Sequence, residues 1–417
     1  MAEQIFASDA PGDWRRLPAH RRWLAGQADA LFDFFQYRAF NPQGGFFDLD
    51  RQGRPLDASN PVRPIHATAR MVHCFVAGSL LGRPGSDRIV DHGLRYLWEA
   101  HRDRKNGGYY WSMENDGPRD ATKQGYGHAF VLLAASGGRL LGHPLADRML
   151  ADVTEILESR FCEEEHGAIA EEFNADWTAF SDYRGQNSNM HLTEALMAAF
   201  EATGDKAYLE KAESIADLVI RRSAGSVGWR VAEHFNADWA LDKNYRGNEM
   251  FRPSGTTPGH WLEWARLILQ LWSLGEKRHD WMPEAAKGLF SQSMSLGWDS
   301  EKSGFFYTLD WEDVPAKRNK LWWPACEGAG AAHYLNEHAP SDFHEESYRK
   351  IWSVIGQAFI DRTNGGWHEE LTEDLVPAHT LFPGKGDIYH ALQACLIPLF
   401  PATGSLTKVI AEAGGNI

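Results

Sequence analysis

The chain has 417 residues, and its 57 Asp and Glu residues outnumber its 42 Lys and Arg residues, which gives a formal net charge of −15. This charge disfavours nucleic acids and anionic membranes as partners, because both attract basic surfaces. Hydrophobic residues make up 43% of the chain and include 17 Trp. That composition argues against disorder and is typical of a large core. It also leaves aromatic rings available to stack on flat ligands such as sugars.

The cysteines and the N-terminus indicate the compartment. Cys74, Cys162, Cys326 and Cys395 lie far apart and form no CxxC motif, so we expect neither a zinc knot nor a disulfide framework. Residues 1–16 lack a basic start followed by an apolar run, so no signal peptide is expected. No stretch approaches the roughly 20 apolar residues that cross a bilayer. We therefore expect a soluble, cytoplasmic protein, and the sequence does not indicate its oligomeric state.

A glycine-led segment with strand-like character recurs along the chain. Its six copies begin at Gly44, Gly107, Gly167, Gly228, Gly304 and Gly365. Most copies start about 60 residues after the previous one, a period that marks a repeat architecture. We therefore expect residues 1–417 to form a single catalytic domain rather than two or three.

The predicted helices follow this repeat in chain order. A first helix over residues 17–35 has no preceding partner. After each glycine-led segment, apolar residues recur at helical spacing, which predicts helices over 66–81, 126–141, 189–203, 258–275, 322–338 and 387–399. Turns such as Gly82–Pro84 then lead from the first five into partners over 86–99, 145–160, 205–222, 282–295 and 341–360.

Twelve helices in six pairs predict an all-α fold, an (α/α)6 barrel with long loops that carry short strands on one rim. The more apolar helices after the loops form the inner ring, and the helix over 17–35 pairs with the last one to close it. An open superhelix is the alternative. In the closed form, the loops and the N-termini of the inner helices crowd one rim, where we expect a pocket.

Polar and aromatic residues recur where each inner helix begins, and in a closed ring they converge on one cavity. In chain order they are His66 and Arg70; Tyr126 and His128; Asn187 and His191; His260 and Glu263; Trp322, Trp323 and Glu327; and Asp387, Tyr389 and His390.

Several chemistries can be weighed on these residues. His260 and Glu263, three residues apart on one helix face, are a possible ligand pair, but no HExxH motif or acidic cluster accompanies them, and we expect no metal or other cofactor. Paired carboxylates for glycoside hydrolysis are available, although nothing in the sequence sets their separation. They are Glu171, Glu172, Glu263, Glu327 and Asp387. Motifs for phosphoryl transfer, serine hydrolysis and dinucleotide binding are missing from the sequence.

Neutral imidazoles beside one arginine and stacking tryptophans suit proton transfer on a monosaccharide. A histidine can remove the acidic C–H beside the carbonyl of an opened aldose, and Arg70 can stabilise the oxygen charge that develops. Return of the proton to the neighbouring carbon gives a ketose, and return to the same carbon from the other face gives the C2 epimer. Residue types alone do not separate these outcomes.

The sequence resembles the N-acylglucosamine 2-epimerase superfamily over residues 14–398, and within it the branch of metal-independent aldose–ketose isomerases. The motifs that carry the resemblance are HATARM from His66, KQGYGHAF from Lys123, NSNMH from Asn187, TPGHWLEW from Thr257, WWP from Trp322 and GKGDIYH from Gly384. Each motif is weak alone, and six in this order are specific.

The resemblance implies an (α/α)6 barrel with two catalytic histidines, which map onto His260 and His390. His390 would move the proton between C1 and C2, and His260, held by Glu263, would assist ring opening; the two roles could be exchanged. Arg70, Tyr126, Asn187 and His191 match substrate-binding positions. Trp322 and Trp323 would line the sugar face, Asp387 would bind substrate, and Glu327 would lie one turn behind.

Departures from the sulfoquinovose-specific members bear on the substrate. Glu249 or Met250, depending on the alignment, and Gly386 stand where those members have an Arg and a Gln for the sulfonate, and a sulfonate needs such donors. His66 lies where that branch often has a Trp. We therefore expect conversion of D-mannose to D-fructose, and of D-lyxose to D-xylulose, through a cis-enediol. Arg252 keeps sulfoquinovose isomerisation open, and a 2-epimerase, a glycosidase or lyase, and a sugar-binding protein without turnover are further alternatives.

Overall fold

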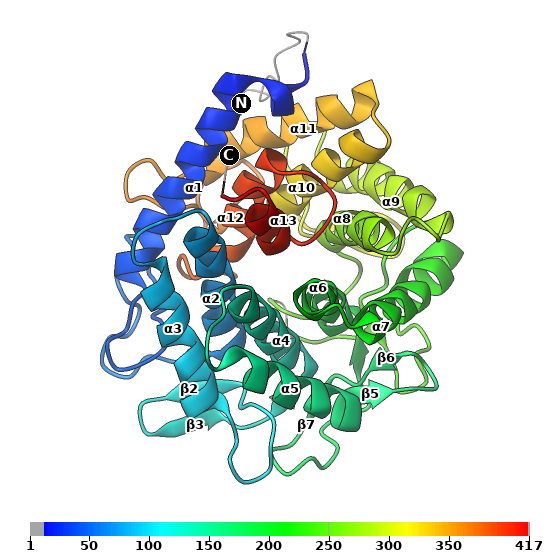
Figure 1. Cartoon of the computed structure of the whole chain (residues 1–417). Helices are drawn as coiled ribbons and strands as arrows, with labels where there is room; N and C mark the ends of the chain where they lie inside the picture. The colour runs from blue at the N-terminus through cyan, green and yellow to red at the C-terminus, as the bar shows by residue number, and fades with distance from the viewer. Residues whose placement is uncertain (1–11, 249, 416–417) are drawn as a thin grey trace.

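The computed structural model describes residues 12–248 and 250–415; residues 1–11, on which part of the signal-peptide prediction rests, and Glu249 lie outside the described residues. Six helices form an inner ring in which each contacts the next and the last contacts the first, so the barrel is closed and the open superhelix is wrong (Figure 1). They are α2 (Ile65–Leu80), α4 (Gly125–Leu140), α6 (Gln186–Thr203), α8 (Pro258–Leu274), α10 (Trp322–His338) and α12 (Tyr389–Leu396).

The outer ring consists of α1 (Pro18–Arg38), α3 (Ser86–Tyr96), α5 (Ala146–Ile156), α7 (Lys206–Ala216), α9 (Trp281–Gln292) and α11 (Asp342–Val354), and a short 3-10 helix, η1 (Trp14–Arg16), precedes it. The first of these, α1, packs against α12, as predicted. The other five continue into π-helical turns that lead to the rim loops: η2 (Leu97–His101), η3 (Leu157–Phe161), η4 (Asp217–Ala224), η5 (Ser293–Gly297) and η6 (Ile355–Phe359).

The inner helices are buried on nearly all sides because small residues let their neighbours approach. On α10, a Cβ added at Gly328 would lie 3.0 Å from Ile351 Cδ1 of α11 and 3.1 Å from the ring of Phe305. The outer helices instead bury one stripe, such as Ile89, Val90 and Leu94 of α3, which is the pattern of a surface helix. This difference explains why the more apolar helices after the loops form the inside.

Short antiparallel strands tie the start of each inner helix to the glycine-led segment of the next repeat. The pairs are β1 (Arg63–Pro64) with β2 (Ser112–Glu114), β4 (Lys123–Gln124) with β7 (Glu172–Phe173), β8 (Arg184–Gly185) with β9 (His234–Phe235) and β12 (Lys320–Leu321) with β13 (Glu370–Leu371). Thr256 bridges Leu309 in the same way, and the amide of Lys385 donates to Leu49 O at 2.8 Å, which closes the rim. This ring of pairings fixes the N-termini of the inner helices around one axis.

The remaining strands are local, and buried ion pairs reinforce the rim. β3 (Gly117–Asp120) pairs with β2, β5 (Cys162–Glu163) with β6 (Ala168–Ile169), and β10 (Thr308–Leu309) with β11 (Pro315–Lys317). In three repeats a lysine just before the inner helix reaches the aspartate that begins the preceding loop: Lys123 with Asp103 at 2.9 Å, Lys320 with Asp299 at 2.9 Å and Lys385 with Asp361 at 2.6 Å. Burial lowers the pKa of Lys320 to about 8, against the opposing effect of Asp299.

The opposite end of the barrel is covered by a C-terminal segment that the sequence pattern did not predict. After α12 and a short 3-10 helix, η7 (Ile397–Leu399), the chain forms α13 (Leu406–Glu412), which packs on α2, α4 and α6 (Figure 1). Val409 and Ile410 are buried there. Across the described residues, the structure contains no helix with the length and apolar character that a membrane crossing requires.

Candidate active site

A pocket lies at the strand rim, where the inner helices begin. Side chains from all six inner helices reach it, together with residues from two of the rim loops and the segment before α12. The lining residues are Arg70, Tyr126, Asn187, His191, Met250, Phe251, Pro253, His260, Glu263, Tyr307, Trp322, Trp323, Phe382 and His390. The catalytic and substrate-binding residues expected from the sequence line this pocket, except Asp387. The predicted convergence holds for these residues but not for His66, His128, Glu327 and Tyr389, which do not line it.

His260, in the first turn of α8, is oriented by a glutamate from the preceding loop. Its Nδ1 lies 2.9 Å from both carboxylate oxygens of Glu233, which can only accept, so Nδ1 donates and Nε2 is left without a proton. Gln186 Nε2 donates to the same carboxylate at 2.9 Å. Burial favours the neutral carboxyl, but the neighbouring His260 outweighs it and holds the pKa of Glu233 below its usual value.

His390, in the first turn of α12, has the same arrangement with a different partner. Its Nδ1 lies 3.0 Å from Glu327 Oε1, and Glu327 Oε2 accepts from Arg266 Nε at 2.9 Å. Burial raises the pKa of Glu327, but the charge of Arg266 and the hydrogen bond from His390 lower it by more than burial raises it. The pKa therefore lies below its usual value, and the carboxylate stays ionised. His390 is thus left with an unprotonated Nε2 and an acceptor behind Nδ1.

The ring of Trp323 contacts both histidines. Its centroid is 4.9 Å from that of His260 and 6.0 Å from that of His390. The pocket therefore brings both imidazoles to one flat indole. This is a surface on which a sugar can lie within reach of two proton-transfer groups.

Arg70, on α2, supplies a fixed positive charge. Its Nη2 donates to Tyr126 Oη at 2.8 Å, and its Nη1 lies 3.4 Å from Asp387 Oδ1. The guanidinium is stacked 4.5 Å from the ring centroid of Phe130 and 4.8 Å from that of Tyr389. Burial alone would lower the pKa of Arg70, but Tyr126 and Asp387 raise it, and the group stays charged.

Three further polar groups of the pocket are available to a ligand. Asn187 Oδ1, His191 Nδ1 and Glu263 Oε1 are buried without a hydrogen-bond partner among the described residues. Burial lowers the pKa of His191 to about 4, so the imidazole is neutral at neutral pH. Buried polar atoms are normally satisfied, and sugar hydroxyls are suitable partners for these three.

Two of the sequence interpretations need correction. Glu263 does not hold His260; its Oε1 lies 3.7 Å from His191 Nδ1 and 3.8 Å from Arg266 Nη2. Asp387 does not line the pocket, because its carboxylate is used by Arg70, by Trp322 Nε1 at 3.1 Å and by the amide of His390 at 3.2 Å. Helical spacing correctly predicted that these residues point toward the inside of the barrel. It could not predict their partners, because most of these come from other elements.

Two other histidines at repeat-equivalent positions lie outside the pocket. His128 donates from Nδ1 to Gln124 O at 2.7 Å and accepts from the amide of Tyr109 at Nε2. His66 packs against Trp111, with ring centroids 5.1 Å apart. Both rings belong to the wall behind the pocket.

The possible ligand pair of His260 and Glu263 does not form a cluster of three ligands with other described residues. Among the described residues, donor atoms that could surround an ion come together at His191, Glu194 and Glu263, not at His260. Arg266 Nη1 lies 3.5 Å from Glu194 Oε1 and its Nη2 lies 3.8 Å from Glu263 Oε1. Positive charge is therefore already supplied to these carboxylates.

Comparisons with known proteins identify the family. A sequence profile of the N-acylglucosamine 2-epimerase (GlcNAc 2-epimerase) family matches residues 44–394. The chain belongs to this family. It is 40% identical to a D-mannose isomerase of Pseudomonas cannabina pv. alisalensis, over 95% of this chain and 97% of that protein, and 38% identical to one of Thermobifida fusca, over 96% and 99%. A crystal structure of a D-mannose isomerase superposes with a TM-score of 0.86 at 30% identity, over 92% of this chain and 99% of that one.

At the corner that we weighed for binding a sulfonate, the positive charge of Arg252 is paired with carboxylates. Arg252 lies 2.8 Å from Glu172 Oε2 and 3.3 Å from Glu171 Oε1, and its guanidinium stacks on Tyr183, so it does not line the pocket. Gly386 lies beside Asp48, whose Oδ1 would be 3.1 Å from an added Cβ. Glu249, the other position weighed for this corner, lies outside the described residues.

Sequence reasoning missed Glu233, Gln186, Arg266 and Glu194. Glu233 could have been found from the repeat itself, because it occupies the same position as Glu171 and Glu369, two residues before the Phe or Leu that ends each segment. All three carboxylates reach the first turn of an inner helix: Glu171 accepts from Ser188 Oγ and Glu369 from the amide of Asp387. Glu194 and Arg266 lie deeper along the inner helices, where a helical pattern alone indicates core positions, and Gln186 is the first residue of α6.

Proposed function

We propose that the protein is a metal-independent aldose–ketose isomerase that converts D-mannose to D-fructose, and D-lyxose to D-xylulose. One observation carries the proposal: two imidazoles, each with Nδ1 held by a buried glutamate, contact Trp323 in a pocket that the fixed cation of Arg70 also lines. The D-mannose isomerases that resemble the chain over nearly its whole length support the same reaction.

His390 acts on the carbon skeleton in this proposal. Its free Nε2 takes the proton from C2 of the open-chain aldose, which leaves a cis-enediolate charged at O1. His260 carries the proton of the O2 hydroxyl to O1, and the same imidazolium of His390 then delivers its proton to C1, which gives the ketose. Glu327 stabilises the imidazolium between the two steps, and Arg70 stabilises the negative charge on the oxygens.

His260 works at the ring and the oxygens. Its Nε2, backed by Glu233, moves the proton between the ring oxygen and O1 when the pyranose opens. Asn187, His191 and Glu263 bind hydroxyls through the atoms that lack protein partners, Tyr126 holds Arg70, and Trp322 and Trp323 line the sugar face. Because each imidazole has a glutamate behind Nδ1, exchange of the two roles is the competing assignment.

A neutral sugar fits this pocket better than a sulfonated one. The positive charge nearest the corner, that of Arg252, is taken by Glu171 and Glu172, and Asp48 adds a carboxyl beside Gly386. A sulfonate there would find no free cation among the described residues and a nearby acid. Sulfoquinovose isomerisation is therefore the second candidate and D-mannose the first.

Product analysis tests the function. Purified protein is incubated with D-mannose in EDTA, and the sugars formed are separated; sulfoquinovose and a mannose-containing disaccharide are assayed in parallel. The proposal predicts D-fructose with mannose, undiminished by EDTA. Glucose without fructose would indicate a 2-epimerase, released monosaccharide a glycosidase, and faster turnover of sulfoquinovose the second candidate. Mannose binding without exchange at C2 in D2O would indicate a binding protein.

The domain organisation, partner, compartment and cofactor requirement that we propose follow from the same function. Residues from both ends of the chain close the ring, so residues 1–417 act as one catalytic domain whose partner is a small monosaccharide. The four cysteines are free, which suits the cytoplasm. The proposed chemistry uses no cofactor, because proton transfer requires only the side chains named above.

A further inference from the structure

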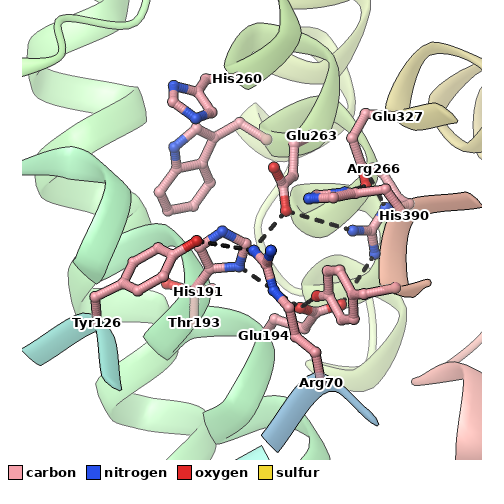
Figure 2. Close-up of polar contacts among 12 residues, drawn as sticks. Arg70, Tyr126, His191, Thr193, Glu194, His260, Glu263, Arg266, Glu327 and His390 are labelled. Atoms are coloured by element: carbon pink, nitrogen blue, oxygen red, sulfur yellow. Dashed lines mark hydrogen bonds and ion pairs between the residues drawn. The ribbon is translucent and has the colours of Figure 1, made fainter. Parts of the chain in front are cut away.

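Arg266 lies at the centre of a buried charge cluster below the pocket. It is on α8, one turn beyond Glu263, and its side chain is 2% exposed. It contacts carboxylates from three inner helices: Glu194 of α6 at 3.5 Å, Glu263 of α8 at 3.8 Å and Glu327 of α10 at 2.9 Å. Figure 2 shows its guanidinium between these groups and behind the residues that line the pocket.

Arg266 does not reach the substrate. It is not a lining residue of the pocket, and it faces a separate small cavity with His73, Gln270 and Tyr334 on the side covered by α13. Its closest contact is the bond from Nε to Glu327 Oε2, and the other oxygen of Glu327 holds His390 Nδ1. The chain of contacts runs from Arg266 through Glu327 to His390 and ends in the pocket.

We propose, on the basis of the isomerase function above, that Arg266 is a positioning residue that keeps Glu327 an ionised acceptor, so that His390 carries its proton on Nδ1 and offers a bare Nε2 to the sugar. A carboxylate this deeply buried ionises only beside a cation. A protonated Glu327 would instead donate to Nδ1 and force the ring proton onto Nε2, where the ring could no longer accept the substrate proton.

Other charged and titratable groups face this cluster. They are Arg70 and His73 of α2, His191 and Glu194 of α6, Glu263 of α8, Cys326 and Tyr334 of α10, Tyr389 of α12 and, beyond Arg70, Asp387. Burial, then the charge of Glu327, raises the pKa of Glu263 well above its usual value, which favours the neutral form of Glu263 beside ionised Glu327. Glu194 also has a bond from Tyr389 Oη.

The sign of the expected pH dependence follows. In Arg266→Met, burial is no longer opposed by the arginine but only by His390, and the pKa of Glu327 rises. Activity should fall at neutral pH and recover as pH rises through the new pKa, because ionised Glu327 restores the working tautomer. We expect the acid limb of the kcat profile to move up by about 1 to 3 pH units, with kcat at pH 7 lower by at least about tenfold and KM within about threefold.

A double-mutant cycle tests whether Arg266 acts through Glu327. Arg266→Met, Glu327→Gln and the double variant are compared over pH, with Arg266→Lys as the conservative rescue and Arg15→Met as the matched control. Arg15 is also a buried arginine, paired with Asp13 and Glu337 at the far end of α10. We expect the double variant to match Glu327→Gln, Arg266→Lys to return the limb toward the wild type, and Arg15→Met to lower Tm without moving the limb.

A second readout does not need turnover. The 15N shifts of labelled histidine report which ring nitrogen of His390 is protonated, with His390→Gln used for assignment. Loss of the Nδ1–H tautomer in Arg266→Met supports the proposal, even if mannose is not the substrate. The proposal is overturned if the acid limb of the kcat profile does not move, the losses of kcat in the two single variants add up in the double variant, and the tautomer of His390 is unchanged. If Arg266→Met does not fold, Arg266→Lys, whose single ammonium reaches fewer carboxylates, must show the smaller shift in the same direction, and no shift is again decisive against it.

Discussion

His260 and His390 both contact the ring of Trp323, and in both the same nitrogen, Nδ1, is bound to a glutamate. In each ring Nδ1 is held by a buried glutamate, at 2.9 Å for Glu233 and 3.0 Å for Glu327. The glutamates come from unrelated places, one from a rim loop and one from the neighbouring inner helix. A rim loop and an inner helix thus favour the same tautomer, with the proton on Nδ1, in both histidines. This is the arrangement that a pair of proton-transfer groups requires.

Replacement of either histidine should abolish turnover without unfolding the barrel. We expect His390→Gln and His260→Gln to lower kcat by about 100-fold or more, because a positioned general acid or base contributes about 10² to 10⁴. Circular dichroism and Tm would establish that the fold is intact. Near wild-type kcat in one variant would remove that residue from the mechanism.

Glu233→Gln tests the corrected partner of His260. The amide keeps the size of the side chain but can donate to Nδ1, which favours the wrong tautomer of His260. We expect kcat to fall by at least about tenfold, yet less than in His260→Gln. Glu171→Gln, at the equivalent position of another repeat, is the matched control and should retain most of the activity, since Glu171 bonds to Ser188 rather than to a histidine.

Arg70→Ala should chiefly lower kcat/KM. Removal of a charge that stabilises a developing oxyanion costs about 3 kcal/mol, which corresponds to about a 100-fold loss. Arg70→Lys should lose less, because it keeps the charge but not the bond geometry with Tyr126 and Asp387. Weaker binding of mannose at unchanged kcat would count against the assigned role.

Glu201 predicts how stability depends on pH at the closed end of the barrel. Its carboxylate accepts from the amide and hydroxyl of Ser405, just before α13, and burial raises its pKa to about 7. A carboxyl whose pKa is raised in the folded state binds more protons there than when unfolded, so its contribution is lost as pH rises from about 4.5 to 7. Glu201→Gln should therefore gain about 2 to 3 kcal/mol relative to the wild type between pH 5 and pH 8. Thermal melts at both values check this, and equal differences would contradict it.

The fold could be predicted from the sequence because its period is explicit. Glycine-led segments about 60 residues apart separate paired amphipathic helices, and α1 and α12 complete each other. The helix α13 was missed because it is a short segment whose burial depends on docking against α2, α4 and α6, which no local pattern reports.

The candidate site was predicted as far as repeat-equivalent positions allow. His260, His390, Arg70 and Asn187 reach the pocket because each begins an inner helix. The partner of His260 was assigned wrongly, since neighbours three apart on a helix share a face but Glu233 is 27 residues away in a loop. Arg266 was overlooked because a charged residue within an apolar helix shows its purpose only when the carboxylates of other helices are placed around it.

Deuterium transfer from C2 to C1 reports directly on the proton shuttle assigned to His390. D-Mannose carrying deuterium at C2 is converted by the wild type and by His390→Gln in ordinary water, and NMR locates the label in the fructose. We expect deuterium at C1 of part of the product, with the remainder exchanged to solvent, and no conversion by the variant. Fructose formed at the wild-type rate by His390→Gln, or glucose as the sole product, would exclude this role of His390.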